Sequence, residues 1–246
     1  MAAGAYNLIS SCRLLVLLTL AGSSTIIMQV NCLNFNYADL EFQKEDEKNF
    51  IFSNNSYIVF RTLQVTPDVN GGISNKSGRA LYNQPFKLYD IGRDMKASFN
   101  SSFVINLFPL TSPPGDGLAF ILTEEASLPE NSGGQWLGII NSTTTGSTNI
   151  VAVEFDTRKS DEQDIDDNHV GIDVRINAGG DGLEIPLLSE HLDLSDYLPQ
   201  DVYVGFSAST GVNATQLNAV RYLQGKLNLQ KLQLRNRLSC GQSRFL

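Results

Sequence analysis

At residues 151–157 the chain reads Val151-Ala-Val-Glu-Phe-Asp-Thr157. Apolar side chains alternate with smaller or charged ones along it, and this period of two predicts a β-strand with one apolar face. On such a strand Glu154 and Asp156 project to the same side of the sheet, away from that face. The stretch therefore predicts a sheet that buries one face and carries paired carboxylates on the other.

Four further segments have the same strand-like character, with Gly, Pro and Asn residues between them. They are Phe103-Val-Ile-Asn-Leu-Phe108, Gly117-Leu-Ala-Phe-Ile-Leu122, Val170-Gly-Ile-Asp-Val-Arg-Ile176 and Val202-Tyr-Val-Gly-Phe206. No convincing amphipathic helix precedes residue 215. Many strands without crossover helices predict an all-β fold, an antiparallel sandwich of jelly-roll type in one domain.

The composition agrees with a folded, acidic domain. The 246 residues are 42% hydrophobic and 18% charged, which excludes a largely disordered chain, and the net charge of −8 argues against nucleic acid as the partner. The charge is uneven along the chain. Residues 33–215 hold 11 basic and 26 acidic residues, whereas the end from Gln216 holds six basic residues and no acid.

The first 32 residues have the pattern of a signal peptide. Arg13 precedes an apolar run, Leu14-Leu-Val-Leu-Leu-Thr-Leu20, and Val30-Asn-Cys32 suits a cleavage site. An uncleaved N-terminal anchor helix is the alternative. No later run reaches 18 apolar residues, so we expect a mature chain without a membrane span, secreted to the extracellular space (the apoplast in a plant). Five sequons support this route and are predicted glycosylation sites: Asn54, Asn75, Asn100, Asn141 and Asn213.

A cluster of acids follows the strand at 151–157. A polar loop leads to Asp164-Ile-Asp-Asp-Asn-His169, which opens the next predicted strand. Three carboxylates, those of Glu154, Asp156 and Asp164, would meet the His169 imidazole on one sheet face and repel one another without a cation. Oxygen ligands suit calcium, and an added imidazole suits manganese or a similar ion. The alternative is a solvated acidic loop.

Two glycine-rich turns are further candidates for a binding site. In one, Asp116 lies between two glycines just before a buried strand, and these could aim its carboxylate at a ligand. In the other, Asn131-Ser-Gly-Gly-Gln-Trp-Leu-Gly138, backbone N–H groups could donate to a ligand. Each is equally consistent with an ordinary turn.

Taken together, these motifs resemble the legume (L-type) lectin domain, a concanavalin-like jelly-roll sandwich. The matching stretches are Leu33–Tyr37, Gly115–Phe120, Val151–Thr157, His169–Asp173 and Leu198–Gly211. The loop Asp156–Ser160 is most similar to that of plant lectin receptor kinases, where the domain lies outside the cell. The resemblance predicts a lectin domain over residues 33–220. The divergent basic tail, residues 221–246, would replace the family's closing strand, and its leucines fit both a helical stripe and a strand.

The resemblance implies a role for each candidate site residue. Glu154, Asp156, Asp164 and His169 would hold manganese; Asp156 and Asp164 would also hold calcium, with the carbonyl of Arg158 and the side chain of Ser160. Asp116, after a cis Gly115–Asp116 bond, would accept hydrogen bonds from sugar hydroxyls, and backbone N–H groups at Gly134 and Gln135 would donate. The implied partners are glycans or glycoproteins, and family members often form homodimers.

At two positions the chain departs from the family's pattern. Ser160 stands where the family has an asparagine that ligates calcium and binds sugar, and Arg158 stands where it has an aromatic platform for the sugar ring. We therefore expect a calcium- and manganese-dependent, carbohydrate-binding domain with an altered monosaccharide site.

Two other functions can be weighed against this one. The chain could be a non-catalytic extracellular binding module, or a truncated receptor-kinase ectodomain, that recognises a non-sugar ligand or a protein. A jelly-roll glycosidase would need a third acid beyond Glu154 and Asp156, but Arg158 and Lys159 occupy those places. We therefore expect no enzymatic activity.

Overall fold

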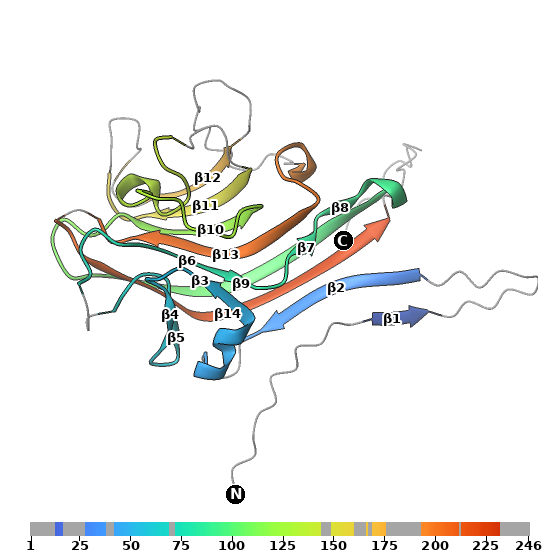
Figure 1. Cartoon of the computed structure of the whole chain (residues 1–246), viewed down its shortest axis with the longest axis horizontal. Helices are drawn as coiled ribbons and strands as arrows, with labels where there is room; N and C mark the ends of the chain where they lie inside the picture. Colours follow the sequence, from blue (N-terminus) through green and yellow to red (C-terminus); the bar gives the residue numbers. More distant parts are fainter. Residues whose placement is uncertain are drawn as a thin grey trace, which may run out of the picture.

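The computed structural model describes residues 13–16, 28–37, 42–68, 72–143, 149–159, 166, 169–175, 193–211 and 213–231. These residues form two antiparallel β-sheets packed face to face (Figure 1). One sheet contains β1 (Arg13–Val16), β2 (Met28–Asn36), β4 (Tyr57–Val59), β5 (Thr62–Gln64), β8 (Tyr89–Asp90), β9 (Met95–Pro109) and β14 (Gln216–Lys231). The other contains β3 (Phe50–Phe52), β6 (Ser77–Tyr82), β7 (Phe86–Lys87), β10 (Gly117–Thr123), β11 (Ile150–Asp156), β12 (His169–Arg175) and β13 (Asp201–Ser209).

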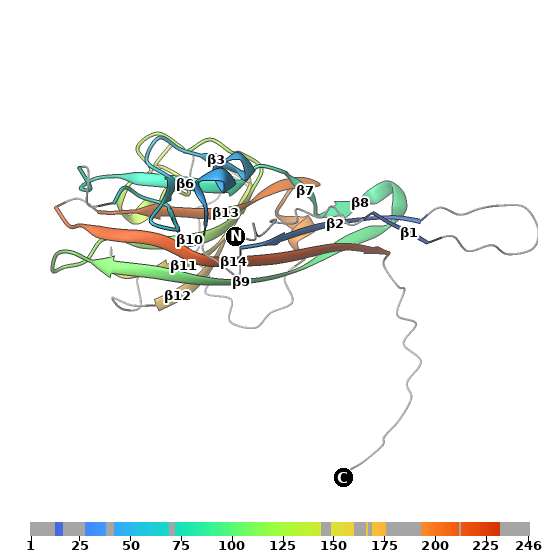
Figure 2. The same cartoon turned by 90° about the horizontal axis from the view of Figure 1, so that it is seen from below.

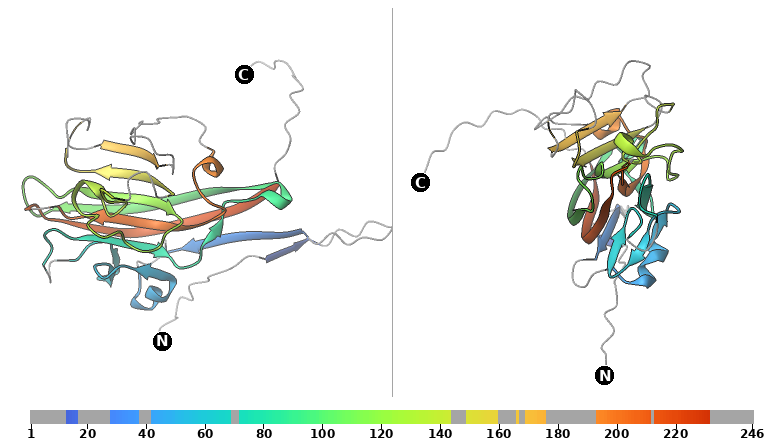
Figure 3. Two further views of the ribbon diagram at one scale, coloured as in Figure 1. Left: turned by 45° about the horizontal axis from the view of Figure 1, so that its top comes forward. Right: turned by 90° about the vertical axis from the view of Figure 1, so that its left-hand side faces the viewer.

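The order of the strands confirms the predicted antiparallel sandwich. The first sheet runs β1-β2-β14-β5-β4, with β9 beside β14 and β8 beside β9. The second runs β12-β11-β10-β13-β6-β3, with β7 beside β13, and Figure 3 shows its neighbours β10, β11 and β12 side by side. The five predicted strand segments fall in β9, β10, β11, β12 and β13, except that Thr157 lies just past β11 and Ile176 lies outside the described residues. Short 3-10 helices η1 (Lys44–Asn49), η2 (Ile91–Arg93), η3 (Gly134–Trp136) and η4 (Leu194–Asp196) occupy the connections.

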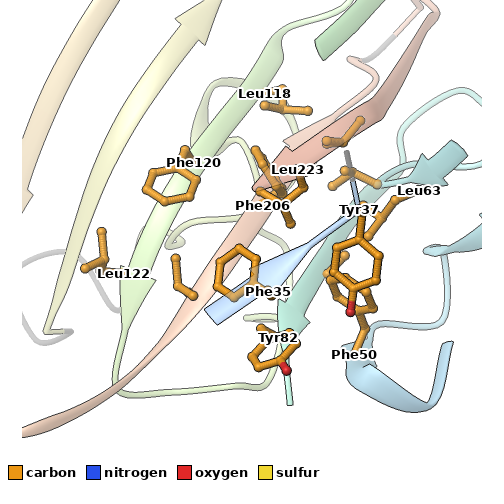
Figure 4. Packing of buried hydrophobic residues seen from close by; sticks show 14 of the residues in the cluster. Phe35, Tyr37, Phe50, Leu63, Tyr82, Leu118, Phe120, Leu122, Phe206 and Leu223 are labelled. Carbon is orange, nitrogen blue, oxygen red and sulfur yellow. The ribbon is translucent and has the colours of Figure 1, made fainter. Parts of the chain in front are cut away.

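The main core lies between the two sheets and is rich in aromatic rings (Figure 4). Phe103 of β9 packs against Phe120 and Phe206 of the opposite sheet, with ring centroids 5.2 Å and 5.3 Å away. Phe120 and Phe206 are themselves 5.5 Å apart. Contacts of this kind join the layers through area burial and favourable ring geometry.

A second apolar interior lies on the other face of the β10 sheet. Because side chains alternate along a strand, Leu118 and Phe120 enter the main core, whereas Ala119 and Ile121 enter this second one. The segment after β10 supplies its cover through side chains such as Leu137. Both faces of β10 are therefore buried, and its residues from Leu118 to Leu122 are all apolar.

Strand β14 continues through the boundary expected after residue 220. It pairs with β9 from Gln216 to Lys231, and Figure 2 shows the two strands running together along the length of the sandwich. Gly225 faces Phe35 of β2, and a Cβ added to Gly225 would lie 2.2 Å from that ring, so only glycine fits there. The first part of the predicted tail, whose period the sequence left undecided, is thus a strand; residues 232–246 lie outside the described residues.

Near the N-terminus, β2 begins at Met28 and passes the cleavage position expected after Cys32. Cleavage of residues 1–32 therefore stays a prediction. Among the described residues, no helix has the length and apolar character needed to cross a membrane.

Candidate functional site

Asp116 lies where the β9–β10 connection enters the second sheet, and its carboxylate is buried (4% exposed). The next residue, Gly117, is opposite Asp156 of β11 on one side and Ser209 of β13 on the other. Gly117 has φ +142°, and an added Cβ would approach the Phe155 carbonyl oxygen to 2.4 Å. This tight register brings Asp116 beside the ends of two neighbouring strands.

Ser209 connects Asp116 to the predicted glycine loop. Its Oγ donates to Asp116 Oδ2 at 3.0 Å and accepts the Gly134 backbone N–H at 2.8 Å. Two predicted site residues, 18 positions apart in sequence, are therefore held together by one buried hydroxyl. Ser209 is not among the site residues predicted from the sequence, although the alternation along β13 could have placed it on the polar face.

The glycine loop differs in detail from what the sequence implied. The N–H of Gly134, expected to donate to a ligand, donates to Ser209. Gly134 has φ +69° and an added Cβ would contact nothing within 4 Å, so the left-handed backbone rather than crowding favours glycine. Gln135 follows within η3 and is exposed.

Arg158 is the cation nearest to the Asp116 carboxylate among the described ion pairs. Its Nη1 lies 3.9 Å from Asp116 Oδ1, and its side chain is 34% exposed. Burial raises the pKa of Asp116 above its usual value, and the Ser209 hydrogen bond and the Arg158 charge oppose this rise. Asp116 is thus a desolvated acceptor that Ser209 and Arg158 help to keep ionised.

Three of the predicted metal ligands share one sheet face. Glu154 and Asp156 are two positions apart on β11, and Asp156 is directly opposite His169 on β12. Asp156 Oδ1 also accepts the Arg158 backbone N–H at 2.8 Å. This donor set is of the type expected for the two ions.

Ser160 and Asp164 lie outside the described residues. Within the described ranges, no three His, Cys, Asp or Glu side chains form a group that could hold a metal. The His169 Nδ1 lies 3.3 Å from the Asp166 carbonyl oxygen, so Asp166, which the resemblance did not assign, also lies beside the predicted ligands.

The expected cis bond before Asp116 is wrong. In the described residues the cis peptide is Ser112–Pro113, three positions earlier. The cis form at a bond to proline is disfavoured far less than at other residues, which is the ordinary reason for finding it there.

Four of the five sequon asparagines are exposed: Asn54, Asn75, Asn100 and Asn213. Asn141 is 9% exposed, and its Nδ2 donates to the Glu130 carbonyl at 2.7 Å. A glycan on Asn141 would have to extend from this buried, hydrogen-bonded amide nitrogen, so the folded arrangement disfavours that site. Glycosylation of the other four stays a prediction.

The two-sheet sandwich and the buried carboxylate beside a glycine loop define the class as a lectin-type binding domain. The sequence matches the Legume lectin domain family over residues 32–179 and 174–234, past the boundary that the sequence analysis placed at 220. The chain therefore belongs to the legume lectin domain family, a family of carbohydrate-binding, non-enzymatic domains.

Its relatives include plant proteins of two kinds. The chain is 41% identical to a probable L-type lectin-domain containing receptor kinase S.5 of Arabidopsis thaliana, over 83% of this chain but only 37% of that protein. It is 30% identical to a lectin alpha chain of Lablab purpureus, over 76% of this chain and 80% of that protein. The chain thus spans little more than a third of the receptor kinase and most of the lectin.

Solved structures agree with these relationships. The metal-free form of lectin I-B4 from Griffonia simplicifolia has a TM-score of 0.67 and 26% identity, over 80% of this chain and 99% of that one. A basic winged bean lectin with Tn-antigen has a TM-score of 0.64 and 28% identity, over 81% of this chain and 99% of that one.

Proposed function

We propose that this chain is the carbohydrate-binding domain of a secreted or cell-surface plant glycoprotein, directed out of the cell by a signal peptide, residues 1–32, that is then cleaved. The observation that carries the proposal is the Asp116–Ser209–Gly134 link, because it holds a buried acceptor next to the glycine loop. The domain binds glycans without transforming them, since Arg158 and Lys159 stand where a glycosidase would need its third acid.

Sugar hydroxyls donate to Asp116 in the proposed complex. A buried, ionised carboxylate is a strong acceptor, and Ser209 fixes one of its oxygens while Arg158 lies near the other. A sugar must therefore share Asp116 Oδ1 with the guanidinium. This is the physical basis for proposing a monosaccharide site that differs from one with an aromatic platform at position 158.

Calcium and manganese are the proposed cofactors. Glu154, Asp156, Asp164 and His169 would hold the manganese, and Asp156, Asp164, the Arg158 carbonyl and Ser160 would hold the calcium. The ions would offset the local negative charge and fix the loop that carries Arg158. The alignment of Asp156 with His169 across β11 and β12 supports this assignment.

A glycan array tests the proposal directly. Purified protein with calcium and manganese is compared with the same protein after chelation, and with an Asp116→Asn variant that keeps the side-chain shape. We expect binding to a restricted set of glycans, lost on chelation and reduced at least about tenfold in the variant, which is about 1.4 kcal/mol. A blank array with both metals present would refute the sugar proposal.

The second candidate is a binding module for a non-sugar ligand or a protein partner, as in a receptor ectodomain. The 3.9 Å approach of Arg158 to Asp116 favours it, because the guanidinium occupies part of the acceptor's surroundings. A Ser160→Asn variant separates the two candidates. Gain of sugar binding would support a retuned sugar site, whereas equal absence in both proteins would support the non-sugar module.

We also propose a homodimer formed through a sheet face. Val104 and Phe108 of β9 are more than half exposed and, being an even number of positions apart, lie on one face of the strand. Sedimentation equilibrium tests this: a Val104→Lys/Phe108→Lys double variant is expected to be monomeric where the wild type is dimeric. A monomeric wild type at all accessible concentrations would refute it.

A further inference from the structure

One of the exposed sequons, Asn75-Lys76-Ser77, lies at the edge of the candidate sugar site. Asn75 is exposed and has φ +53°, a left-handed conformation that asparagine tolerates better than most residues. No hydrogen bond of its side-chain amide occurs among the described residues. It therefore differs from Asn141, whose amide is buried and engaged.

The backbone around Asn75 is fixed to the segment that follows β13. The Asn75 N–H donates to the Gly211 carbonyl at 2.8 Å, and the Lys76 N–H donates to Thr210 Oγ1 at 2.9 Å. In return, the Thr210 N–H donates to the Lys76 carbonyl at 2.9 Å. The position of the sequon relative to β13 is therefore set by several hydrogen bonds.

This segment contacts the Asp116 carboxylate. A Cβ added to Gly211 would lie 3.2 Å from Asp116 Oδ2 and 3.4 Å from Oδ1. On its other side, Asn75 faces the glycine loop, since a Cβ added to Gly133 would lie 3.6 Å from Asn75 Oδ1. Asn75 thus stands between the two loops that flank Asp116.

We propose that an N-glycan on Asn75 covers the candidate sugar site and limits the access of external glycans to Asp116. The inference rests on the proposed function, because it assigns a regulator to that same site. Asn75 contacts both Gly133 and Gly211, which lie on either side of Asp116. A core glycan of several sugar units extends farther than these contacts, so it would reach over the Asp116 carboxylate. Removing it should strengthen binding, whereas removing a distant glycan should not.

Asn100 provides the matched control. It is an exposed sequon residue opposite Lys226 on β14. The β9–β14 ladder ends near the candidate site, where Pro109 pairs with Gln216, because Gln216 lies beside Gly115, the neighbour of Asp116. At about 3.4 Å per residue, Asn100 is about 30 Å along β9 from that end. A glycan there leaves the site open.

The experiment compares protein from a plant secretory expression system with two variants, Ser77→Ala and Ser102→Ala. Each removes one sequon and keeps its asparagine, so the left-handed backbone at Asn75 is preserved. Mass spectrometry measures occupancy, and titration on array-selected glycans measures affinity. We expect Asn75 to be occupied, Ser77→Ala to bind at least about threefold more tightly than wild type, and Ser102→Ala to bind as wild type does.

An unoccupied Asn75 would overturn the inference. It would also fail if Ser77→Ala bound no better than wild type while Asp116→Asn still weakened binding at least about tenfold, a result that leaves the proposed function intact. If no form bound any glycan, including enzymatically deglycosylated protein, the proposed function would fail and the inference with it. An Asn75→Gln variant repeats the test with the sequon removed at its other end.

Discussion

The two apolar interiors on either face of the β10 sheet are held in different ways. The one between the sheets is filled with aromatic rings from both layers, such as Phe103, Phe120 and Phe206. The second one lies under a long connection rather than under a sheet, and its apolar residues are mostly aliphatic. A sheet presents an apolar face whose backbone groups are already paired. An irregular segment has backbone groups that need partners, so the second interior requires a polar side chain that bonds to them.

That side chain is Arg79 of β6, which is 2% exposed. Its Nη1 donates to the carbonyls of Glu125 and Ser127, at 3.0 and 2.7 Å, and its Nη2 to those of Gly138 and Ile139, at 2.7 and 3.0 Å. No salt bridge to Arg79 occurs within the described part of the chain. Burial lowers the pKa of Arg79 to about 10, so the side chain stays charged at neutral pH.

The comparison predicts that the aromatic interior controls global stability. Phe206→Ala should lower the free energy of unfolding by about 3–5 kcal/mol, because it removes a fully buried ring and leaves a cavity. Urea denaturation measures this, with Phe206→Leu as the milder control. A loss below 1 kcal/mol would contradict the central role given to this cluster.

Arg79→Met should act more locally. The substitution leaves four carbonyl groups without their donor, and we expect a loss of at least about 3 kcal/mol, concentrated in the segment 124–141. Hydrogen exchange should rise first at Leu137 and Gly138, whereas Phe206→Ala should raise exchange throughout the sheets. Arg79→Lys keeps the charge and part of the bonding and should lie between. If both variants raised hydrogen exchange evenly throughout the sheets, the two interiors would not be held in different ways.

Ser209→Ala tests the point where the second interior meets the site. We expect about 1–2 kcal/mol of destabilisation, since the Gly134 N–H and Asp116 both lose a partner. Without this donor the pKa of Asp116 should rise further, so sugar binding should be lost at a higher pH than in the wild type. An unchanged pH profile of binding would show that Ser209 does not tune Asp116. Ser207→Ala on the same strand is the control.

The smallest expected effect lies outside both interiors, at the Lys96–Asp193 salt bridge between β9 and the start of η4. Hydrogen bonds from Lys96 and then Ser195 lower the pKa of Asp193 to about 2. The stability they contribute is therefore present above the ordinary Asp value near 3.8 and lost as the pH falls through about 2. Both side chains are more than a third exposed, so we expect well under about 1 kcal/mol. Asp193→Asn should flatten this part of the stability profile; an identical acid transition would contradict it.

The strands could be predicted because their signals are local. The alternation at residues 151–157 and the apolar run at 117–122 identified β11 and β10, and the former also placed Glu154 and Asp156 on one face. The end of the chain was harder, since its leucines fit two periods. Pairing with β9, β2 and β5, each more than a hundred residues away in sequence, shows that Gln216–Lys231 is a strand.

The parts that could not be predicted depend on distant partners. Arg79 bonds to carbonyls 46–60 positions away, and Ser209 to a carboxylate 93 positions away, so neither has a local signature. Asp116 and Gly134 were identified individually, but their connection through Ser209 was not. The assignment of Ser160 and Asp164 to the metals stays a prediction.

The hydroxyl of Ser209 makes two equilibria thermodynamically reciprocal. Because its hydrogen bond lowers the pKa of Asp116, and because the same oxygen accepts the Gly134 N–H, docking of the glycine loop and ionisation of the carboxylate favour each other. Whatever detaches the loop raises the proton affinity of Asp116, and protonation of Asp116 loosens the loop by the same free energy. Acid and loop opening therefore act together on the Asp116 carboxylate.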